Sequence, residues 1–354
     1  MQKNYARGVL CCLIATVAWG GMFPVMDDAL AKIDAFHFTA IRYSVAGLAF
    51  LVLLLAREGR RALSLAGERY VLAWFLGSAG FAGFGFLVFL GQRLAGREGA
   101  LTASLMMATM PMLALLVGWC MGRARPPLFS MGFIALSFLG VVLVITDGHP
   151  QRLLHQYANY QSNALVLLGA LCWVIYTVGA SLFPHWSPYR YTTLTSLLGL
   201  STVFAVVIAL RVAGLIQPVS LGDVVAIAPH LFYMIFLAGF VAVLAWNIGN
   251  SIITPLNGVL FMDVVPLTAF IVSALAGVPP RSGQVMGATL TASALILNNI
   301  FLRRRMGAPA QCSTWNASSK PAKLIPRGGG NLSQPLEHGL AKPIALHQLD
   351  AGRE

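Results

Sequence analysis

Two ionisable side chains lie inside long apolar segments of this sequence, and their chemistry makes them the first candidates for a functional site. Arg42 stands six residues into the apolar run 36–56, and Asp263 lies about halfway along the run 251–277. If these runs cross a lipid bilayer, an ionisable group at mid-depth costs at least about 2.5–3.5 kcal/mol, so it is a functional candidate by default. A guanidinium can bind a carboxylate, whereas a carboxyl group can carry a proton or pair with an ammonium group.

Each of these residues also has a purely structural interpretation. Arg42 could lie near the membrane interface and extend its head group to water or lipid. Asp263 could form a hydrogen bond with a neighbouring helix, or an ion pair with Arg42. Pro266 leaves the carbonyl of Met262 without its helical N–H partner, so the segment around Asp263 is expected to be polar and deformable.

Aromatic residues in several apolar runs are candidates for the wall of a binding site. Aromatic walls suit an amphipathic metabolite, although each such residue could also serve ordinary packing. Trp173 and Tyr176 are three residues apart, so they share one face of a helix. The candidate substrate-binding residues are Trp19, Phe23, Arg42, Tyr43, Trp173, Tyr176 and Asp263.

The sequence lacks the motifs of several common kinds of catalytic, nucleotide-binding and metal site. There is no Gly-rich phosphate loop, so ATP is not expected to drive the protein through this chain. No pair of histidines has metal-ligand spacing, and no Ser-His-Asp set lies within one apolar run. Four of the five cysteines lie in apolar runs, and none has disulfide or metal spacing. We therefore predict no catalytic residue, no metal and no cofactor.

The elements that position these residues must be membrane-spanning helices. Hydrophobic residues make up 57% of the 354 residues and charged residues 10%, against roughly 25% charged in soluble proteins. A helical span needs about 20 mostly apolar residues. The sequence contains ten such runs, at 8–27, 36–56, 70–91, 99–121, 127–146, 163–183, 190–211, 229–247, 251–277 and 283–302.

The net charge of +12 is explained by membrane topology better than by nucleic-acid binding. Basic residues gather in the short connections between runs and in the C-terminal segment. If the N-terminus lies inside, the inner connections hold more Lys and Arg than the outer ones, as the positive-inside rule requires. The sequence thus predicts a multi-pass protein of the cytoplasmic (inner) membrane with both termini in the cytoplasm.

The apolar part of the chain nearly repeats itself at a period of about 155 residues. Trp19 corresponds to Trp173, Pro111 to Pro266, and Gly132 to Gly287. Each copy holds five runs, and five is odd, so the second copy must enter the membrane from the opposite side. Many secondary transporters are built from such inverted repeats, with the substrate site near the bilayer midplane between them.

Glycine and proline interrupt several of the runs. Gly20, Gly21 and Pro24 lie in the first run, Pro111 in the fourth and Pro266 in the ninth. We predict helix kinks there, because irregular helix is tolerated in a membrane where it borders a cavity or is packed in protein. The alternative is that Gly20 and Gly21 allow close helix packing.

The predicted domains are the first repeat at 8–146, the second at 163–302, and a cytoplasmic tail at 303–354. The tail is rich in Pro, Gly, Ser, Lys and Gln, which predicts disorder. Polar residues flank the short connection predicted near 247–251, where most are expected to cap helices. They are Trp246, Asn247, Asn250 and Asn257.

Together these residues resemble the drug/metabolite transporter superfamily, specifically a pair of EamA-type domains. Trp19-Gly20 with Phe23-Pro24 and Arg42 in "FTAIRYSVAGLAFLVLL" match the first two helices of that pattern. The stretches "ASLMMATMPMLALLVG", "ALCWVIYTVGASLF" and "PLTAFIVSALAG" match the fourth, sixth and ninth. The resemblance covers roughly residues 8–302.

The resemblance implies an all-α integral membrane protein of ten transmembrane helices, arranged as two inverted five-helix repeats. It also implies both termini inside and transport of small metabolites, very often export. The sequence departs from the pattern after the fourth and ninth helices. Gly-Glu is frequent there in the family, but this chain has Gly122-Arg123 and Gly277-Val278.

We therefore predict a secondary active transporter that exports a small metabolite by alternating access, with amino acids and related compounds as candidates. Its partners are the substrate, the lipid bilayer and, as a candidate coupling ion, the proton at Asp263, with no nucleic acid. An intramembrane enzyme acting on a lipid-linked substrate is one alternative, disfavoured because no cluster of titratable groups is found. A scaffold or sensor acting through the basic tail is the other. The oligomeric state stays open.

Overall fold

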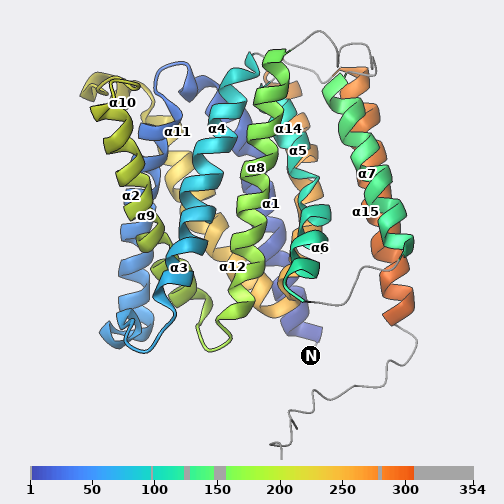
Figure 1. Ribbon diagram of the computed structural model, residues 1–354, viewed down its shortest axis with the longest axis horizontal. Coiled ribbons are helices and arrows are strands. Elements are labelled where there is room, and N and C mark those ends of the chain that lie inside the picture. The colour runs from blue at the N-terminus through green and yellow to red at the C-terminus, as the bar shows by residue number, and fades with distance from the viewer. Residues whose placement is uncertain (1, 97–98, 123–127, 147–156, 278–280, 307–354) are drawn as a thin grey trace, which may run out of the picture. The chain divides into compact units, whose positions relative to one another are not determined.

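The computed structural model describes residues 2–96, 99–122, 128–146, 157–277 and 281–306, and these residues form helices without strands. The first half contains α1 (Gln2–Leu30), α2 (Ala35–Glu58), η1 (Arg60–Leu63), α3 (Tyr70–Gly77), η2 (Ser78–Gly83), α4 (Phe84–Leu94), α5 (Gly99–Met107), α6 (Met110–Cys120) and α7 (Leu128–Thr146). The second contains α8 (Tyr157–Gly179), η5 (Ala180–Leu182), α9 (Pro188–Val212), α10 (Leu221–Ala226), α11 (Ala228–Phe232), η6 (Tyr233–Val241), α12 (Ala242–Ile253), α13 (Pro255–Gly258), η7 (Val259–Asp263), α14 (Val264–Leu275) and α15 (Ser282–Met306) (Figure 1).

Seven continuous helical segments are long and apolar enough to cross a membrane, and α5 with α6 makes an eighth if that bent pair is one span. The seven are Tyr5–Leu30, Ala35–Glu58, Tyr70–Leu94, Tyr160–Leu182, Pro188–Val212, Ala228–Ile253 and Pro255–Leu275. Helices α7 and α15 occupy the remaining two predicted runs. Ten membrane crossings therefore stay a prediction, while the all-helical membrane fold is observed.

One of the predicted connections between runs is misplaced. The eighth run does not end near residue 247, because α12 continues to Ile253 and the chain turns at Thr254. Thr254 has φ = 76° and is the one non-glycine residue with positive φ in the described part of the chain. It precedes Pro255, which disfavours helical conformation in the residue before it. At the C-terminus, α15 includes residues 303–306, and the rest of the predicted tail lies outside the described residues.

The glycines of the first run serve close packing. Helix α1 extends from Gln2 to Leu30 with Pro24 inside it and no interruption in its assignment. A Cβ atom at Gly20 would collide with Thr268 of α14, and one at Gly21 would collide with the hydroxyl of Tyr233. The alternative of close packing thus describes these positions.

Helix irregularity is found around the two later prolines. Helices α5 and α6 meet at 43° just before Pro111, which occupies the first turn of α6. Pro266 lies in the first turn of α14, directly after the 3₁₀ segment η7. Proline suits the first helical turn, where its missing N–H costs nothing.

A π-helical segment occurs at the same place in each half of the chain. Segment η2 begins at Ser78 and η6 begins at Tyr233, which is the spacing of about 155 residues seen in the sequence repeat. After each segment the N–H reaches five residues back, from Phe84 to the carbonyl of Ala79 and from Ala242 to that of Leu237. Insertions of this kind leave carbonyl groups free for other partners.

The two halves exchange their first helices. Helix α1 packs mainly against α12 and α14 of the second half, and α8 packs against α4, α5 and α6 of the first. The second helices of the two halves, α2 and α9, contact each other, as do the fifth helices, α7 and α15 (Figure 1). This reciprocal pairing is the arrangement expected of a pseudo-two-fold axis between two repeats.

Hydrogen bonds show that the repeats are inverted. Gln92 near the end of α4 donates to the carbonyl of Phe23 near the end of α1, at 2.8 Å. Ser162 near the start of α8 donates to the carbonyl of Gly91, the residue before Gln92 in α4, at 2.7 Å. Helix α8 therefore begins on the side where α1 ends.

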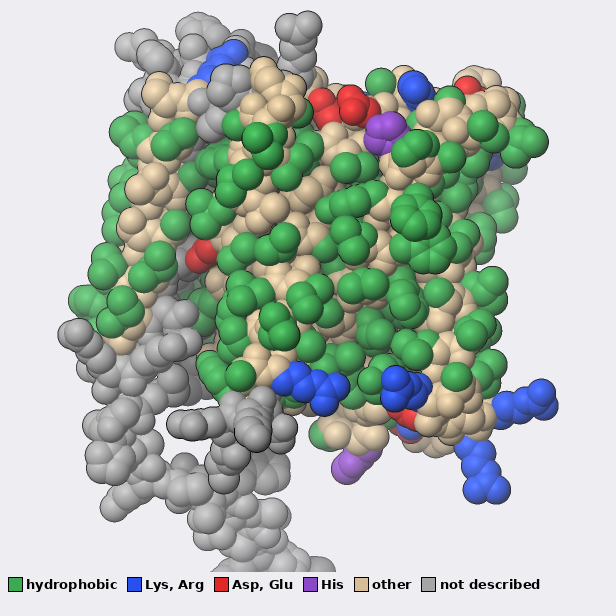
Figure 2. Space-filling view, turned by 180° about the vertical axis from the view of Figure 1, so that it is seen from behind, with side chains coloured by type: hydrophobic (Ala, Val, Ile, Leu, Met, Phe, Trp, Pro, Cys, Tyr) green, Lys and Arg blue, Asp and Glu red, His purple; other side chains and the backbone are tan. Residues whose placement is uncertain are grey.

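The described surface is apolar between two charged edges. Figure 2 shows hydrophobic side chains across the face, with most Lys, Arg, Asp, Glu and His side chains at the two ends of the helices. Large apolar side chains on several helices are exposed, among them Leu48, Val52, Ile208, Leu267 and Ile271. Such a continuous apolar surface marks the part of the protein that faces lipid.

The glycine contact between α3 and α9 gives a test of this packing. In Gly77→Ala the new methyl group meets the backbone carbonyl of Thr195 and the N–H of Gly199, neither of which can rotate away. We expect a loss of about 1–3 kcal/mol of stability and a lower melting temperature in detergent. The control is Gly132→Ala in α7, where nothing lies within 4 Å of the new atom. A Gly77→Ala protein as stable as the wild type would contradict the described contact.

Candidate substrate site

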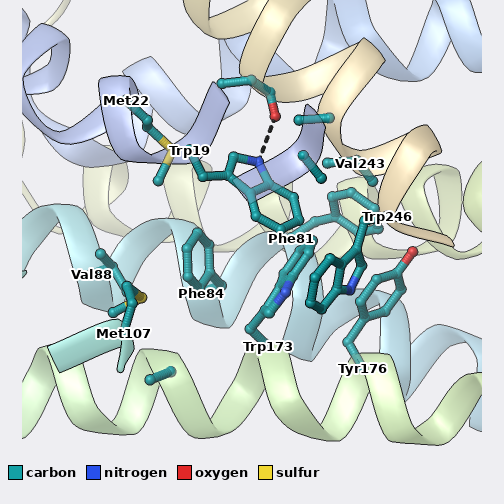
Figure 3. Packing of buried hydrophobic residues seen from close by; sticks show 14 of the residues in the cluster. Trp19, Met22, Phe81, Phe84, Val88, Met107, Trp173, Tyr176, Val243 and Trp246 are labelled. Atoms are coloured by element: carbon teal, nitrogen blue, oxygen red, sulfur yellow. Dashed lines mark hydrogen bonds between the residues drawn. The ribbon is translucent and has the colours of Figure 1, made fainter. Parts of the chain in front are cut away.

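The centre of the protein is a cluster of tryptophans contributed by both repeats (Figure 3). The rings of Trp19 and Trp173, which occupy equivalent positions in the two repeats, meet edge to face with centroids 5.1 Å apart. Trp246 lies 5.2 Å from Trp19, while Phe84 and Tyr176 lie 5.2 and 5.1 Å from Trp173. Edge-to-face contacts stabilise such pairs beyond their burial. The repeat axis therefore passes through an aromatic cluster.

A small cavity of about 10 Å³ borders this cluster. It could hold a single water molecule at most, so the centre is closed to any metabolite in this conformation. Both repeats line it, and four of its side chains are methionines, which adapt readily to different shapes. The lining residues are Trp19, Met22, Phe23, Phe84, Met107, Met110, Trp173, Met262 and Val265.

A hydrogen-bonded layer separates the tryptophan cluster from one end of the protein. Asn247 donates to the hydroxyls of Tyr176 and Thr192, both at 2.8 Å. Tyr191 donates to the carbonyl of Tyr176 at 2.7 Å and stacks on its ring. Trp246 donates to Thr177 at 3.0 Å. We call Tyr176, Tyr191, Thr192 and Asn247 the tyrosine–asparagine layer.

An open cavity of about 250 Å³ lies on the far side of the tyrosine–asparagine layer. Tyr191 and Asn247 form part of its wall, together with residues of the α8–α9 connection and of the end of α12. The cavity thus reaches from the end of the protein to the layer that closes the centre.

Gln92 occupies the position in the first repeat that Asn247 occupies in the second, 155 residues later along the printed sequence. It is fully buried, donates to the carbonyl of Phe23, and its carbonyl oxygen has no partner in the described part of the chain. The sequence analysis overlooked Gln92 and assigned Asn247 to helix capping. The available signal was an amide side chain inside an apolar run at the same repeat position in both copies.

Arg42 does not extend to the membrane interface. Its side chain is 1% exposed, and its guanidinium stacks over the rings of Tyr43 and Phe89, at 4.7 and 5.6 Å. One terminal nitrogen, Nη2, lies 3.4 Å from the carbonyl of Ala238, to which Trp19 also donates at 2.9 Å. Nε and Nη1 have no partner among the described residues.

The carbonyl of Ala238 is available because η6 is π-helical. In an α-helix it would accept from the N–H of Ala242, but that group donates to Leu237 instead. The two donors from the first repeat, Trp19 and Arg42, take its place. The irregular segment of the second repeat thereby positions the candidate residues of the first.

Asp263 lies apart from the tryptophan cluster. Its neighbours Met262 and Val265 line the central cavity, whereas Asp263 lines a separate cavity of about 330 Å³ that it shares with α14 and α15. One carboxylate oxygen, Oδ1, has no hydrogen-bond partner in the described residues. The ion pair with Arg42 considered from the sequence does not form.

Of the remaining candidates, the structure brings Phe23 and Tyr176 to the centre, beside Trp19 and Trp173. Tyr43 lies further out, linked to Tyr176 through Phe81, with centroid distances of 4.9 and 5.4 Å. No group of three His, Cys, Asp or Glu residues in the described ranges could hold a metal ion.

Outside the spans, Asp223 has a lowered pKa for a purely structural reason. At the start of α10, the hydroxyl and backbone N–H of Ser220 donate to Asp223 and hold the pKa of its carboxyl group below the usual value. This is a helix capping box, which needs no ligand.

The family model described as the EamA-like transporter family matches this chain twice, at residues 6–146 and 162–300. The chain belongs to the EamA-like transporter family. It is 37% identical over 297 residues to "Uncharacterized transporter YrdR" of Bacillus subtilis (strain 168), covering 84% of this chain and 92% of that relative. It is 27% identical over 268 residues to "Uncharacterized transporter YyaM" of the same organism, covering 74% and 85%.

A solved crystal structure shares the fold of this EamA-like transporter. The two superpose with a TM-score of 0.63 at 18% identity, covering 84% of this chain and 99% of the other. At that identity the likeness concerns the fold alone. The two matches to the family model and the apolar helices identify a multi-pass membrane transporter with the EamA two-repeat fold.

The tyrosine–asparagine layer can be tested through stability. Asn247→Leu removes two buried hydrogen bonds and leaves the Tyr176 hydroxyl without its donor, which costs about 1–3 kcal/mol. We expect a lower melting temperature in detergent. Asn257→Leu is the control, because Asn257 is exposed and donates to the carbonyl of Ile253 four residues earlier in the chain. Equal melting temperatures for the two variants would rule out this role for Asn247.

Proposed function

We propose that this protein is a secondary active transporter that exports a small metabolite by alternating access, with the substrate held at the tryptophan cluster. The observation that supports this most is the closed centre on the repeat axis, with an open cavity leading to it from one end. A permanent channel would leave the centre open. Candidate substrates are amino acids and related compounds, and the protein acts as a carrier without catalytic residues or cofactor.

The contacts on the two sides of the centre would open in turn during the cycle. On one side the tyrosine–asparagine layer must part to admit the substrate, and on the other side the bond between Gln92 and Phe23 must break. Because the repeats are related by a pseudo-two-fold axis, opening one side and closing the other exchanges similar contacts. A modest difference in free energy between the two states then suffices for substrate binding to shift the equilibrium.

The energy would come from the substrate gradient or from protons, with Asp263 as the proton carrier. Asp263 lies at the junction of η7 and α14, and it lines the same cavity as Ala108 at the break between α5 and α6. Segments with irregular backbone are the ones that can move without breaking a regular helix. A change in the charge of Asp263 would therefore act where the two repeats meet.

For the orientation, we propose that the N-terminus and the end of the protein that carries η1 lie in the cytoplasm of an inner-membrane protein. Arg60 and Arg61 belong to η1, and Arg190 of α9 donates to the carbonyl of Ala62 there. Asp34, in contrast, caps α2 at the opposite end of that helix. This distribution agrees with the positive-inside rule.

Flux through proteoliposomes tests the transporter proposal. We expect purified protein to move at least one compound of a radiolabelled panel of amino acids and cationic drugs, intact and faster than protein-free liposomes. Trp173→Leu should slow that flux by about tenfold or more, since a lost ring contact near 1.4 kcal/mol corresponds to a factor of ten. The control is Trp74→Leu, which changes an exposed tryptophan of α3. Chemical conversion of a compound without transfer would contradict the proposal.

Proton coupling is tested by Asp263→Asn under an imposed pH gradient. The amide cannot exchange a proton, so flux should lose its response to the gradient while exchange of substrate across the membrane continues. Asp28→Asn is the matched control, because the Asp28 side chain is 80% exposed at the end of α1. If the Asp263→Asn protein responds to the gradient as the wild type does, Asp263 is not the coupling group.

A further inference from the structure

We propose that Arg42 is the anchor for a carboxylate of the transported substrate, so that the substrate class is small carboxylate-bearing compounds with an apolar body. This rests on the proposed transport function, whose substrate it makes more specific. The argument uses the burial of the guanidinium, its unused donors, and its place beside Trp19.

Arg42 is a buried charge without a counter-ion. It is 1% exposed, and no Asp or Glu of the described residues lies within ion-pair distance of it. An uncompensated buried charge is expensive, and a structural role would be met more cheaply by an apolar side chain. A negatively charged ligand supplies the missing partner.

The unused donors around Arg42 match a carboxylate. Nε and Nη1 are without partners, and so are the hydroxyls of Thr39 and Tyr43. Arg42 and Tyr43 follow Thr39 by three and four residues on α2, so each is a neighbour of Thr39 on the helix surface. A planar guanidinium presents pairs of N–H groups that fit two carboxylate oxygens, and the two hydroxyls are further unused donors on the same helix.

The present partner of Arg42 is one that a substrate can displace. The contact from Nη2 to the carbonyl of Ala238 is 3.4 Å long, and the same oxygen is already satisfied by Trp19 at 2.9 Å. Losing Arg42 therefore leaves no buried carbonyl unpaired. A bound carboxylate would form shorter, charge-assisted bonds in its place.

The location also defines the rest of the ligand. Trp19 and Arg42 meet at one carbonyl oxygen, and Trp19 lines the central cavity with Phe84 and Trp173. A carboxylate on Arg42 thus places the adjoining part of the substrate against aromatic rings and methionines. Compounds that join a carboxylate directly to an apolar group fit both regions.

The test is equilibrium binding of [¹⁴C]benzoate to the full-length protein in detergent, with benzamide and benzylamine as competitors. Benzamide keeps the ring without the charge, and benzylamine reverses the charge. We expect saturable binding that unlabelled benzoate displaces and neither competitor does. In Arg42→Gln the Kd should rise at least about tenfold, and in Arg42→Lys by less, because lysine keeps the charge without the paired donors. Arg211→Gln, at an exposed arginine of α9, should bind as the wild type does.

A second variant guards against misfolding of Arg42→Gln. Thr39→Val is nearly isosteric and removes one of the unused hydroxyls, so it should weaken benzoate binding without lowering the melting temperature. Wild-type protein that binds no benzoate, competition by benzamide as strong as by benzoate, or equal Kd values in the wild type and both variants would each overturn the inference. The flux panel includes cationic compounds, so it can support transport even where this inference fails.

Discussion

The carbonyl of Ala238 is the contact on which the centre of the protein depends. It belongs to the second repeat, and it accepts from Trp19 and Arg42 of the first. The π-helical form of η6 favours this, because the N–H of Ala242 donates to Leu237 and leaves the Ala238 carbonyl to these side chains. In a membrane a free carbonyl is costly unless a protein donor satisfies it, so the irregular helix depends on a donor such as Trp19. Trp19 is thereby held against Trp173, and Arg42 is held in the protein interior.

Close backbone approach is the second constraint, and it explains where glycine occurs. Lipid and apolar side chains are chemically alike, so helices in a bilayer associate through packing and hydrogen bonds. Gly20 lets α1 approach α14, and Gly77 lets α3 approach α9 at Gly199. The Gly20 contact thus brings the first helix of one repeat against the other repeat, where Trp19 forms its buried hydrogen bond with Ala238.

The sequence predicts the helical fold, the duplication and most of the central residues, because each leaves a local or periodic signal. Long apolar runs give the spans, and the spacing of about 155 residues gives the repeat. Contacts between distant segments leave no such signal. Nothing local shows that Arg42 points inward to Ala238 while Asp263 faces a different cavity from Met262. The same limitation explains why Asn247 was assigned to helix capping. Its sequence position suits a cap, and its actual partners, Tyr176 and Thr192, are distant in the sequence.

Equivalent residues of the two repeats have different hydrogen-bond partners. The proposed mechanism requires this difference, because only one side of the protein is open at a time. The indole N–H of Trp19 is bonded, whereas that of Trp173 has no partner in the described residues. Asn247 donates to two side chains, whereas Gln92 donates to the backbone carbonyl of Phe23 and its own oxygen has no partner in the described residues. A transporter in which both repeats had identical contacts would open equally to both sides. Because the tyrosine–asparagine layer is more densely hydrogen-bonded, opening that side costs more free energy, and contacts with the substrate must offset this cost. The unused donors of Arg42 and Trp173 are groups that can form such contacts.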